Sequence, residues 1–222
     1  MKPTEELKDP DETFTVATHL FTTEGASRGS KSRNEQVTHT GRDMIVESLS
    51  AIPASKPGLY QVRMAAHRPA ANLHGGVYVT VDVPDFAKRA VSFSGVLVSL
   101  AEWASIGVRD PMAELLPAEP TTSRVFSLLD RVHAYVRVYQ AKGRKPVAVP
   151  VRIRIVDDHD RVVLDRSEPL EPGRFTAATR GADVRVELPT ATLPPGAYLL
   201  TFDAELGDTT ARRELRFTVR TR

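Results

Sequence analysis

Two stretches of this chain share one pattern, and that pattern decides the fold: "KPGLYQVRMAAH" at residues 56–67 and "PPGAYLLTFDAE" at residues 194–205. Each contains Pro-Gly, one further residue, a tyrosine, and then a run in which every second residue is apolar. In both runs the apolar side chains lie on the same side of the strand as the tyrosine, Tyr60 or Tyr198, because strand side chains alternate between faces. The chain therefore contains two similar β-modules.

The two tyrosines have a predicted structural role. Immunoglobulin-like sandwiches place a tyrosine at the start of a late strand, with its hydroxyl bonded to backbone a few residues upstream. A buried hydroxyl without a partner costs about 1 to 3 kcal/mol, so Tyr60 and Tyr198 need such a bond. Gly58 and Gly196, in the preceding Pro-Gly pairs, are expected to form the bend that leads into each strand. The alternative is that the tyrosines stack against a ligand.

The same alternation of apolar and polar residues recurs along the chain. Turn signals such as "QAKGRKP" and "ELGDTT" separate the runs, as expected for hairpins. The sequence predicts an all-β protein of two tandem immunoglobulin-like or fibronectin type III-like antiparallel β-sandwiches. The clearest alternating runs are Val77–Val83, Val132–Val138, Val149–Ile155, Val184–Leu188 and Leu215–Val219.

The spacing of the repeat predicts an incomplete first module. Gly58 and Gly196 are 138 residues apart (196 minus 58), and this offset moves the strands at 124–140 to positions before Met1. "TFTVATHLF" then corresponds to "PVRIRIVDD", and "MIVESL" to "DVRVEL". The first module is thus expected to lack its opening strands. Either the chain is a fragment, or another segment or chain completes the module, and an open sheet edge can pair with a partner strand.

These patterns divide the chain into four parts. Residues 1–12 are predicted to be disordered or extended, 13–88 to form the first module, and 124–222 to form the second. Residues 89–123 are expected to connect the modules through one strand and a short helical turn. Pro111 suits the first position of that turn, at 110–116.

Composition excludes several classes of function. The 222 residues include 30 basic and 28 acidic ones, a net charge of +2, and the two signs are interspersed, which argues against nucleic-acid binding. The chain has no cysteine, so disulfides, thiolate catalysis and cysteine-ligated metals are excluded. No apolar run approaches the roughly 18 residues of a membrane span, and "MKPTEELKDPDE" lacks the apolar core of a signal peptide. We expect no membrane span and no export signal in this chain.

One cluster has the residue types of a metal site. Asp157, Asp158, His159 and Asp160 could ligate calcium or zinc. They lie where a hairpin turn is expected, and aspartate is common in turns because its carboxylate bonds to local backbone. We favour the turn, assign no metal site, and keep the cluster as an alternative.

Other candidates have weaker signals. His67 and His74 flank the loop "HRPAANLHGG" and could approach one another, but without a third ligand they are interpreted as surface histidines. Trp103, the single tryptophan, is expected to pack between the modules or to cap a binding patch. Motifs for a nucleophile elbow, a phosphate-binding loop or a zinc protease are missing, so we predict no catalytic residue and no cofactor.

The ordered series of strands resembles a known family. "YQVRMAAH", "GGVYVTVDVPDFAKRAVSFSGVLVS", "LLPAEPTTSRVFSLLDRVHAYVRVYQ" and "LPPGAYLLTFDAELGDTTARRELRFTV" together resemble the C-terminal region of bacterial VWFA-related domain proteins, from about Phe14 onward. The resemblance implies an exported protein in which a von Willebrand factor A domain precedes this region. That domain would bind metal through Asp-x-Ser-x-Ser. "DRSEP" at Asp165 departs from this motif, so no metal site is transferred.

The predicted function is a non-catalytic interaction or spacer module of an exported or envelope-associated bacterial protein. Its partner is expected to be a protein, bound by strand addition to the first module, and the oligomeric state is open. One alternative is a carbohydrate-binding module using Tyr135 and Tyr139 as an aromatic pair. A second is a metal-dependent hydrolase using Asp157 to Asp160.

Overall fold

The computed structural model describes residues 11–38, 47–100 and 120–221. These residues form two compact units, and the division falls between Val83 and Pro84. All regular elements of the described residues are β-strands, apart from short 3-10 turns. The prediction of an all-β, antiparallel architecture is confirmed.

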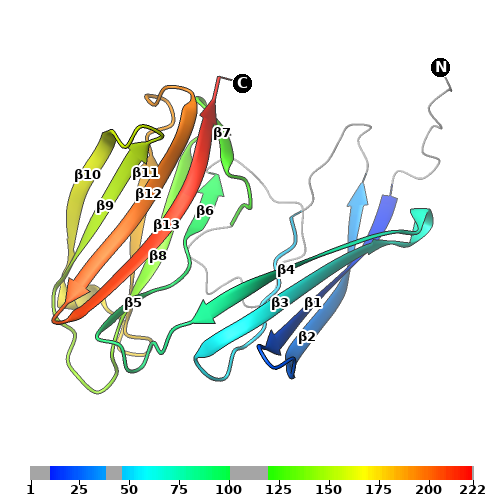
Figure 1. Ribbon diagram of the computed structural model, residues 1–222, viewed down its shortest axis with the longest axis horizontal. Coiled ribbons are helices and arrows are strands. Elements are labelled where there is room, and N and C mark those ends of the chain that lie inside the picture. Colours follow the sequence, from blue (N-terminus) through cyan, green and yellow to red (C-terminus); the bar gives the residue numbers. More distant parts are fainter. Residues whose placement is uncertain (1–10, 39–46, 101–119, 222) are drawn as a thin grey trace. The chain divides into compact units, whose positions relative to one another are not determined.

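The first unit contains one four-stranded sheet in the order β2-β1-β3-β4 (Figure 1). All three pairings are antiparallel. A 3-10 turn, η1, and Asn72 in the left-handed region (φ 50°) join β3 to β4. The elements are β1 (Asp11–Thr22), β2 (Ser27–Thr38), β3 (Gly58–Arg68), η1 (Pro69–Ala71) and β4 (Leu73–Val83).

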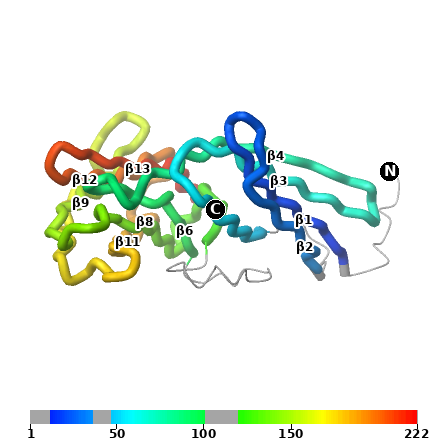
Figure 2. The backbone as a smooth tube through the Cα atoms, turned by 90° about the horizontal axis from the view of Figure 1, so that it is seen from below, coloured from blue at the N-terminus to red at the C-terminus, as the bar shows by residue number. Residues whose placement is uncertain are grey.

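The second unit is a sandwich of two sheets. The larger sheet has the order β10-β9-β12-β13-β7, in which β7 is parallel to β13, and the smaller has the order β11-β8-β5, with β6 also paired to β8. Figure 2 shows the two layers, with β12 and β13 in one and β8 and β11 in the other. The elements are β5 (Val91–Phe93), β6 (Leu97–Leu100), β7 (Val125–Ser127), β8 (Val132–Gln140), β9 (Val149–Asp157), β10 (Val162–Leu170), η3 (Pro172–Arg174), β11 (Gly181–Leu188), β12 (Gly196–Leu206) and β13 (Thr209–Arg220).

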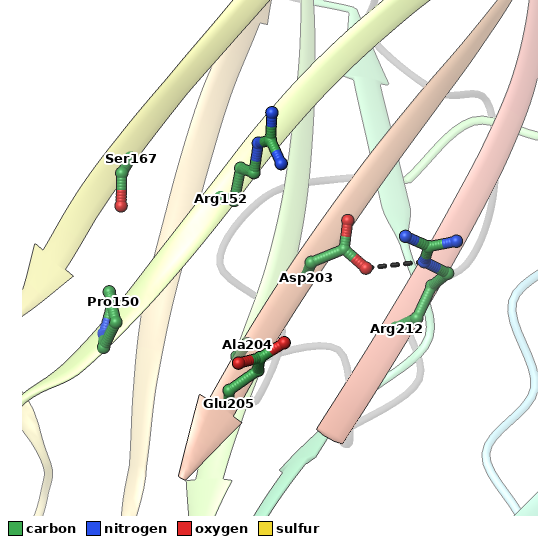
Figure 3. A pocket seen from close by; sticks show the side chains of 7 residues that line it. All are labelled: Pro150, Arg152, Ser167, Asp203, Ala204, Glu205 and Arg212. Atoms are coloured by element: carbon green, nitrogen blue, oxygen red, sulfur yellow. Dashed lines mark hydrogen bonds and ion pairs between the residues drawn. The ribbon is translucent and has the colours of Figure 1, made fainter.

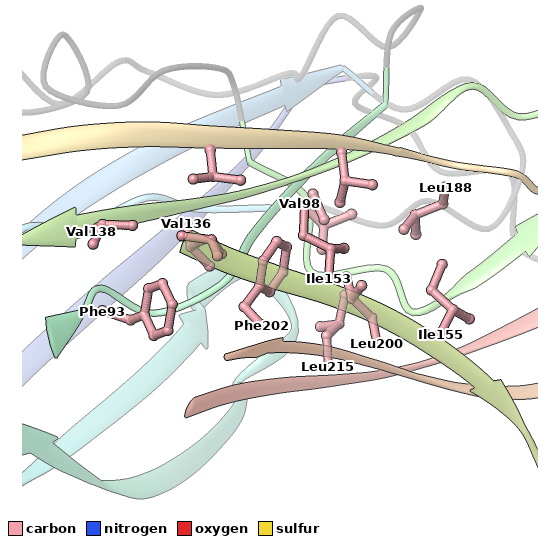
Figure 4. Packing of buried hydrophobic residues seen from close by; sticks show 14 of the residues in the cluster. Phe93, Val98, Val136, Val138, Ile153, Ile155, Leu188, Leu200, Phe202 and Leu215 are labelled. Carbon is pink, nitrogen blue, oxygen red and sulfur yellow. The ribbon is translucent and has the colours of Figure 1, made fainter. Parts of the chain in front are cut away.

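The core of the second unit lies between its sheets. Strand alternation delivers every second side chain to this interior, and Figure 4 shows the buried side chains of both sheets gathered there, among them Val136, Ile153, Leu200 and Phe202. These side chains are almost completely removed from water. Burial of apolar surface, at roughly 25 cal/mol per Å², is the dominant favourable contribution to folding of such a sandwich.

The two units share one four-strand arrangement. The order β2-β1-β3-β4 of the first unit matches the order β10-β9-β12-β13 of the second. The register matches as well, since Tyr60 of β3 is paired with Val81 of β4 and Tyr198 of β12 is paired with Phe217 of β13. The first sheet is therefore equivalent to four of the five strands in the larger sheet of the second unit.

The prediction that residues 89–123 connect two modules is wrong in the described part of this segment. Its described part, 89–100, contains two strands, β5 and β6, and both belong to the smaller sheet of the second unit instead of a connection with one strand. The boundary accordingly falls after Val83, not after Lys88. β5 has three residues, too few to display an alternating pattern, and Ser94-Gly95 interrupts the run before β6. The expected helical turn at 110–116 and Trp103 lie outside the described residues.

The second layer expected from "MIVESL" is not a strand in its described part. Residues 47–50 have no regular structure, although the equivalent residues in the second unit form β11. The segment nevertheless lies against β2, because the Ser48 hydroxyl donates to Glu35 at 3.0 Å and Ile52 is close to Gly29. Residues 47–52 therefore pack against strand β2 at one edge of the sheet. Residues 39–46 and 1–10 are outside the described part of the chain.

Candidate functional site

Tyr60 and Tyr198, which we call the corner tyrosines, each make the same kind of hydrogen bond. The Tyr60 hydroxyl donates to the carbonyl of Lys56 at 2.7 Å, and the Tyr198 hydroxyl donates to the carbonyl of Pro194 at 2.6 Å. Each ring is 5% exposed, which leaves no surface for a stacked ligand. Burial raises the pKa of the Tyr198 phenol, and the nearby carboxylate of Asp157 raises it further. These tyrosines anchor the sheets.

The two glycines of the Pro-Gly pairs differ. Gly58 has φ +141°, which L-residues with a Cβ rarely adopt, so a glycine is required there. Gly196 is not among the described residues with positive φ. A Cβ on Gly196 would meet the Tyr198 ring at 3.9 Å, an ordinary contact. Only the first of the two bends depends on glycine.

The most unusual surface of the first unit is on β4. We define the β4 surface as the edge of this strand that pairs with no other strand among the described residues, together with the side chains of Val77, Val79 and Val81. These three valines point to the same face as Tyr60 and are 65%, 55% and 37% exposed. On the opposite face Tyr78 is 71% exposed. The alternation at Val77–Val83 predicted one buried face, and β4 instead exposes apolar side chains on both.

The inner face of the equivalent strand in the second unit is buried. Leu215 and Phe217 of β13 occupy the positions of Val79 and Val81 and are 7% and 2% exposed. At one end of β13, residues 218–220 pair with β7, whose Phe126 ring lies 6.4 Å from the Phe217 ring. β4 has no equivalent of β7 among the described residues.

Strand β5 covers the inner face of β13 through an arginine. Arg213, at the position of Val77, donates to the backbone carbonyls of Phe93 at 3.1 Å and Ser94 at 2.9 Å. The described residues contain no such cover for β4. The valines are exposed because alternation specifies which face is apolar, whereas other segments determine whether that face is buried.

The two edges of the first sheet differ in character. Natural sheets protect exposed edges with charged side chains, proline, bulges or a covering segment. β2 has Lys31, Arg33 and Glu35, and its Arg33 and Glu35 pair at 3.2 Å. β4, "LHGGVYVTVDV", has one carboxylate, Asp82, in eleven residues. β4 is therefore the edge suited to pairing with another strand.

The acidic cluster forms the β9–β10 turn. One ligand atom each from Asp157, Asp158 and His159 lies within 4.8 Å of the others. Asp157 Oδ1 accepts the backbone N–H groups of His159 and Arg161, both at 2.9 Å, and its Oδ2 accepts from Arg161 Nε at 2.7 Å. Burial acts to raise the pKa of Asp157, but these hydrogen bonds outweigh it and hold the pKa below its usual value. Both oxygens already have partners, and Asp160 lies outside the group, in the left-handed region at φ 60°.

The remaining sequence candidates are dispersed. His67 and His74 stand opposite each other in the β3–β4 register, so they do meet at the base of the loop, and both are exposed. No third metal-ligating side chain groups with them among the described residues.

Tyr135 and Tyr139 are half-buried, and the Tyr139 ring packs 4.5 Å from that of Phe86 at an interplanar angle of 53°. This packing does not favour an open aromatic platform.

A shallow depression on the second unit had no signal in the sequence. It has a volume of about 340 Å³ on the outer face of the larger sheet (Figure 3) and is lined by Pro150, Arg152, Ser167, Asp203, Ala204, Glu205 and Arg212. Arg212 Nε donates to Asp203 at 2.5 Å, and Arg152 makes two bonds to Asp165 at 2.8 and 2.6 Å. Arg152 lowers the pKa of Asp165 through the same contact. The ion pairs satisfy the arginines, and the wall contains no nucleophile hydrogen-bonded to a base.

Comparisons with known proteins give only distant likenesses. No family model matches the chain, and no curated protein matches it. No helix among the described residues is long and apolar enough to cross a membrane.

Among solved structures, a protein assigned as a β-galactosidase from Bacteroides fragilis aligns with 93% of the chain at 11% identity and a TM-score of 0.39. A β-glucuronidase from Parabacteroides merdae aligns with 98% at 13% identity and 0.35, and dimeric latent PorU from Porphyromonas gingivalis with 99% at 11% and 0.34. The chain spans only 30%, 27% and 17% of these structures, respectively. They assign no activity to it.

Proposed function

We propose that this chain is a non-catalytic β-sandwich interaction module that binds a protein partner through the β4 surface. The observation that supports the proposal is the contrast at one equivalent position, where Val79 is 55% exposed and Leu215 is 7% exposed. An extended partner segment that pairs with the edge of β4 would satisfy its backbone hydrogen-bonding groups. Side chains of that segment could also shield the valines.

The proposal assigns separate roles to the two units. The second unit, with its core buried between two sheets and its ion-paired outer face, is a stable scaffold. The first unit presents the surface that binds. Following the resemblance to VWFA-related domain proteins, we further propose that the module acts in an exported or envelope-associated bacterial protein, where partners are met outside the cytosol.

Photo-crosslinking tests the binding surface. A photoreactive amino acid at Val79 should form a covalent adduct with a partner in the native cell, identified by mass spectrometry. The matched control is Val162 on β10, an exposed valine (48%) on an edge strand that also has Asp165, Arg166 and Pro169. No adduct from position 79, or equal adducts from both positions, would remove the proposal.

A further inference from the structure

We propose that the strand received by β4 is β4 of a second copy of this chain, paired antiparallel about a twofold axis that passes through Tyr78. This inference rests on the proposed function, since it requires that the free edge of β4 accepts a strand. It goes further by naming the partner, the orientation and the register.

The length of β4 selects the register. The strand runs from Leu73 to Val83, and Tyr78 is its central residue. An antiparallel pairing centred there matches all eleven residues of one copy with all eleven of the other. A shift of two residues in either direction leaves two residues of each strand unpaired, so the centred register forms the most backbone hydrogen bonds.

The side chains of β4 complement themselves in this register. His74 lies opposite Asp82 of the second copy, and the twofold axis repeats this pair, so the imidazole N–H can donate to the carboxylate at both ends of the interface. Both residues are exposed and share the face of Tyr78. Directly opposed charged or hydrogen-bonding pairs stabilise an antiparallel ladder, whereas like charges destabilise it. A parallel pairing in register would instead place the two Asp82 carboxylates side by side.

The apolar residues also match. Val77 of one copy lies opposite Val79 of the other, and Leu73 lies opposite Val83. Gly75 and Gly76 add no bulky side chain near the approaching strand; a Cβ on Gly75 would meet nothing within 4 Å. In this pairing the same surface of each copy contacts the other. Such a twofold contact uses up the surface of both copies, so the assembly is a closed dimer and not a fibre.

Engineered cysteines test the register, because the chain contains no native cysteine. Tyr78→Cys places two thiols directly opposite each other, at a Cα separation of about 4.5 to 5.5 Å, which a disulfide spans. Thr80→Cys is the control on the same face. Its partner in the ladder is Gly76, so the two introduced thiols are about 13 Å apart along the strand. Under a mild oxidant, the Tyr78→Cys chain should form a disulfide-linked dimer and the Thr80→Cys chain should stay unlinked.

A charge exchange tests the His74–Asp82 pair in the full chain. His74→Asp opposes two carboxylates at each end and should weaken the dimer roughly tenfold, measured as the dissociation constant by analytical ultracentrifugation. Adding Asp82→His to this variant restores an opposed imidazole and carboxylate and should restore the affinity. Equal affinities for the parent, single and double variants would refute the proposed register.

The outcomes separate this inference from the proposed function. Light scattering after size-exclusion chromatography should give the mass of two chains. A monomer at every concentration, with position 79 crosslinked to a different protein, would refute the dimer and leave the interaction module intact. A monomer with no adduct at position 79 would refute both. Equal linkage of the Tyr78→Cys and Thr80→Cys chains would also overturn the twofold arrangement.

Discussion

Strands β4 and β13 occupy the same place in two matching sheets, each beside a strand that begins with a corner tyrosine. Their alternating patterns are similar, yet the inner face of β13 is buried and that of β4 is exposed. The difference comes from segments that lie far from β13 in the sequence: β5 contacts its inner face through Arg213, and β7 pairs with residues 218–220 at one end of its edge. A strand's own residues thus specify an apolar face, while remote segments decide whether that face becomes core or binding surface.

The largest expected effect comes from truncating matched positions. Phe217→Ala should lower the unfolding free energy of the second unit by about 3 to 5 kcal/mol, because the ring is buried against Tyr198 and Phe126. Val81→Ala, at the equivalent position, should cost less than about 1 kcal/mol, since the side chain is already partly exposed. Hydrogen exchange of peptides from β3–β4 and β12–β13 measures each unit separately. Similar losses of unfolding free energy in both units would contradict the contrast between a buried β13 and an exposed β4.

The next effect concerns the bends before the tyrosines. Gly58→Ala forces a Cβ into the conformation at φ +141° and should destabilise the first unit by about 1 to 3 kcal/mol. Gly196→Ala should change the stability of the second unit by no more than about 0.5 kcal/mol, as its Cβ meets the Tyr198 ring at an ordinary distance. Chemical denaturation of the two variants compares them directly. A larger loss of stability for Gly196→Ala than for Gly58→Ala would contradict the conclusion that only the first bend depends on glycine.

The smallest effect should be equal in the two units. Tyr60→Phe and Tyr198→Phe each remove one hydroxyl bond to a backbone carbonyl while keeping the ring in place. Each should cost about 1 kcal/mol. Thermal unfolding combined with hydrogen exchange would report the loss in the unit concerned. If one substitution were neutral, that tyrosine would not anchor its sheet.

Much of the second unit could be predicted from the sequence, because its strands are long enough to display a period of two. The runs at Val132–Val138 and Val149–Ile155 became β8 and β9, with their valines and isoleucines in the core. The corner tyrosines could also be located, since Pro-Gly-x-Tyr is a local signal. The β9–β10 turn at Asp157 followed from the backbone bonding of aspartate.

Other features depend on tertiary structure and left no local signal. β5 is only three residues long, and its assignment to the second unit rests on pairing with β8 and on Arg213. Residues 47–50 cover β2 without forming a strand, so the alternation in "MIVESL" was misleading there. The exposure of Val77 and Val79 could not be predicted either, because it depends on whether a distant segment packs over them. The depression beside Asp203 required knowing that β9 and β13 flank β12.

The bond from Arg213 to Phe93 joins residues 120 positions apart. Contacts of such high sequence separation slow folding, because a long loop must close before they can form. During translation, β1 to β4 pair only with one another, all within residues 11–83, and can assemble as soon as Val83 has left the ribosome. The sandwich that follows must wait for its last strand to emerge, so the nascent chain exposes β5 and β8 to chaperones while residues 141–220 are being made.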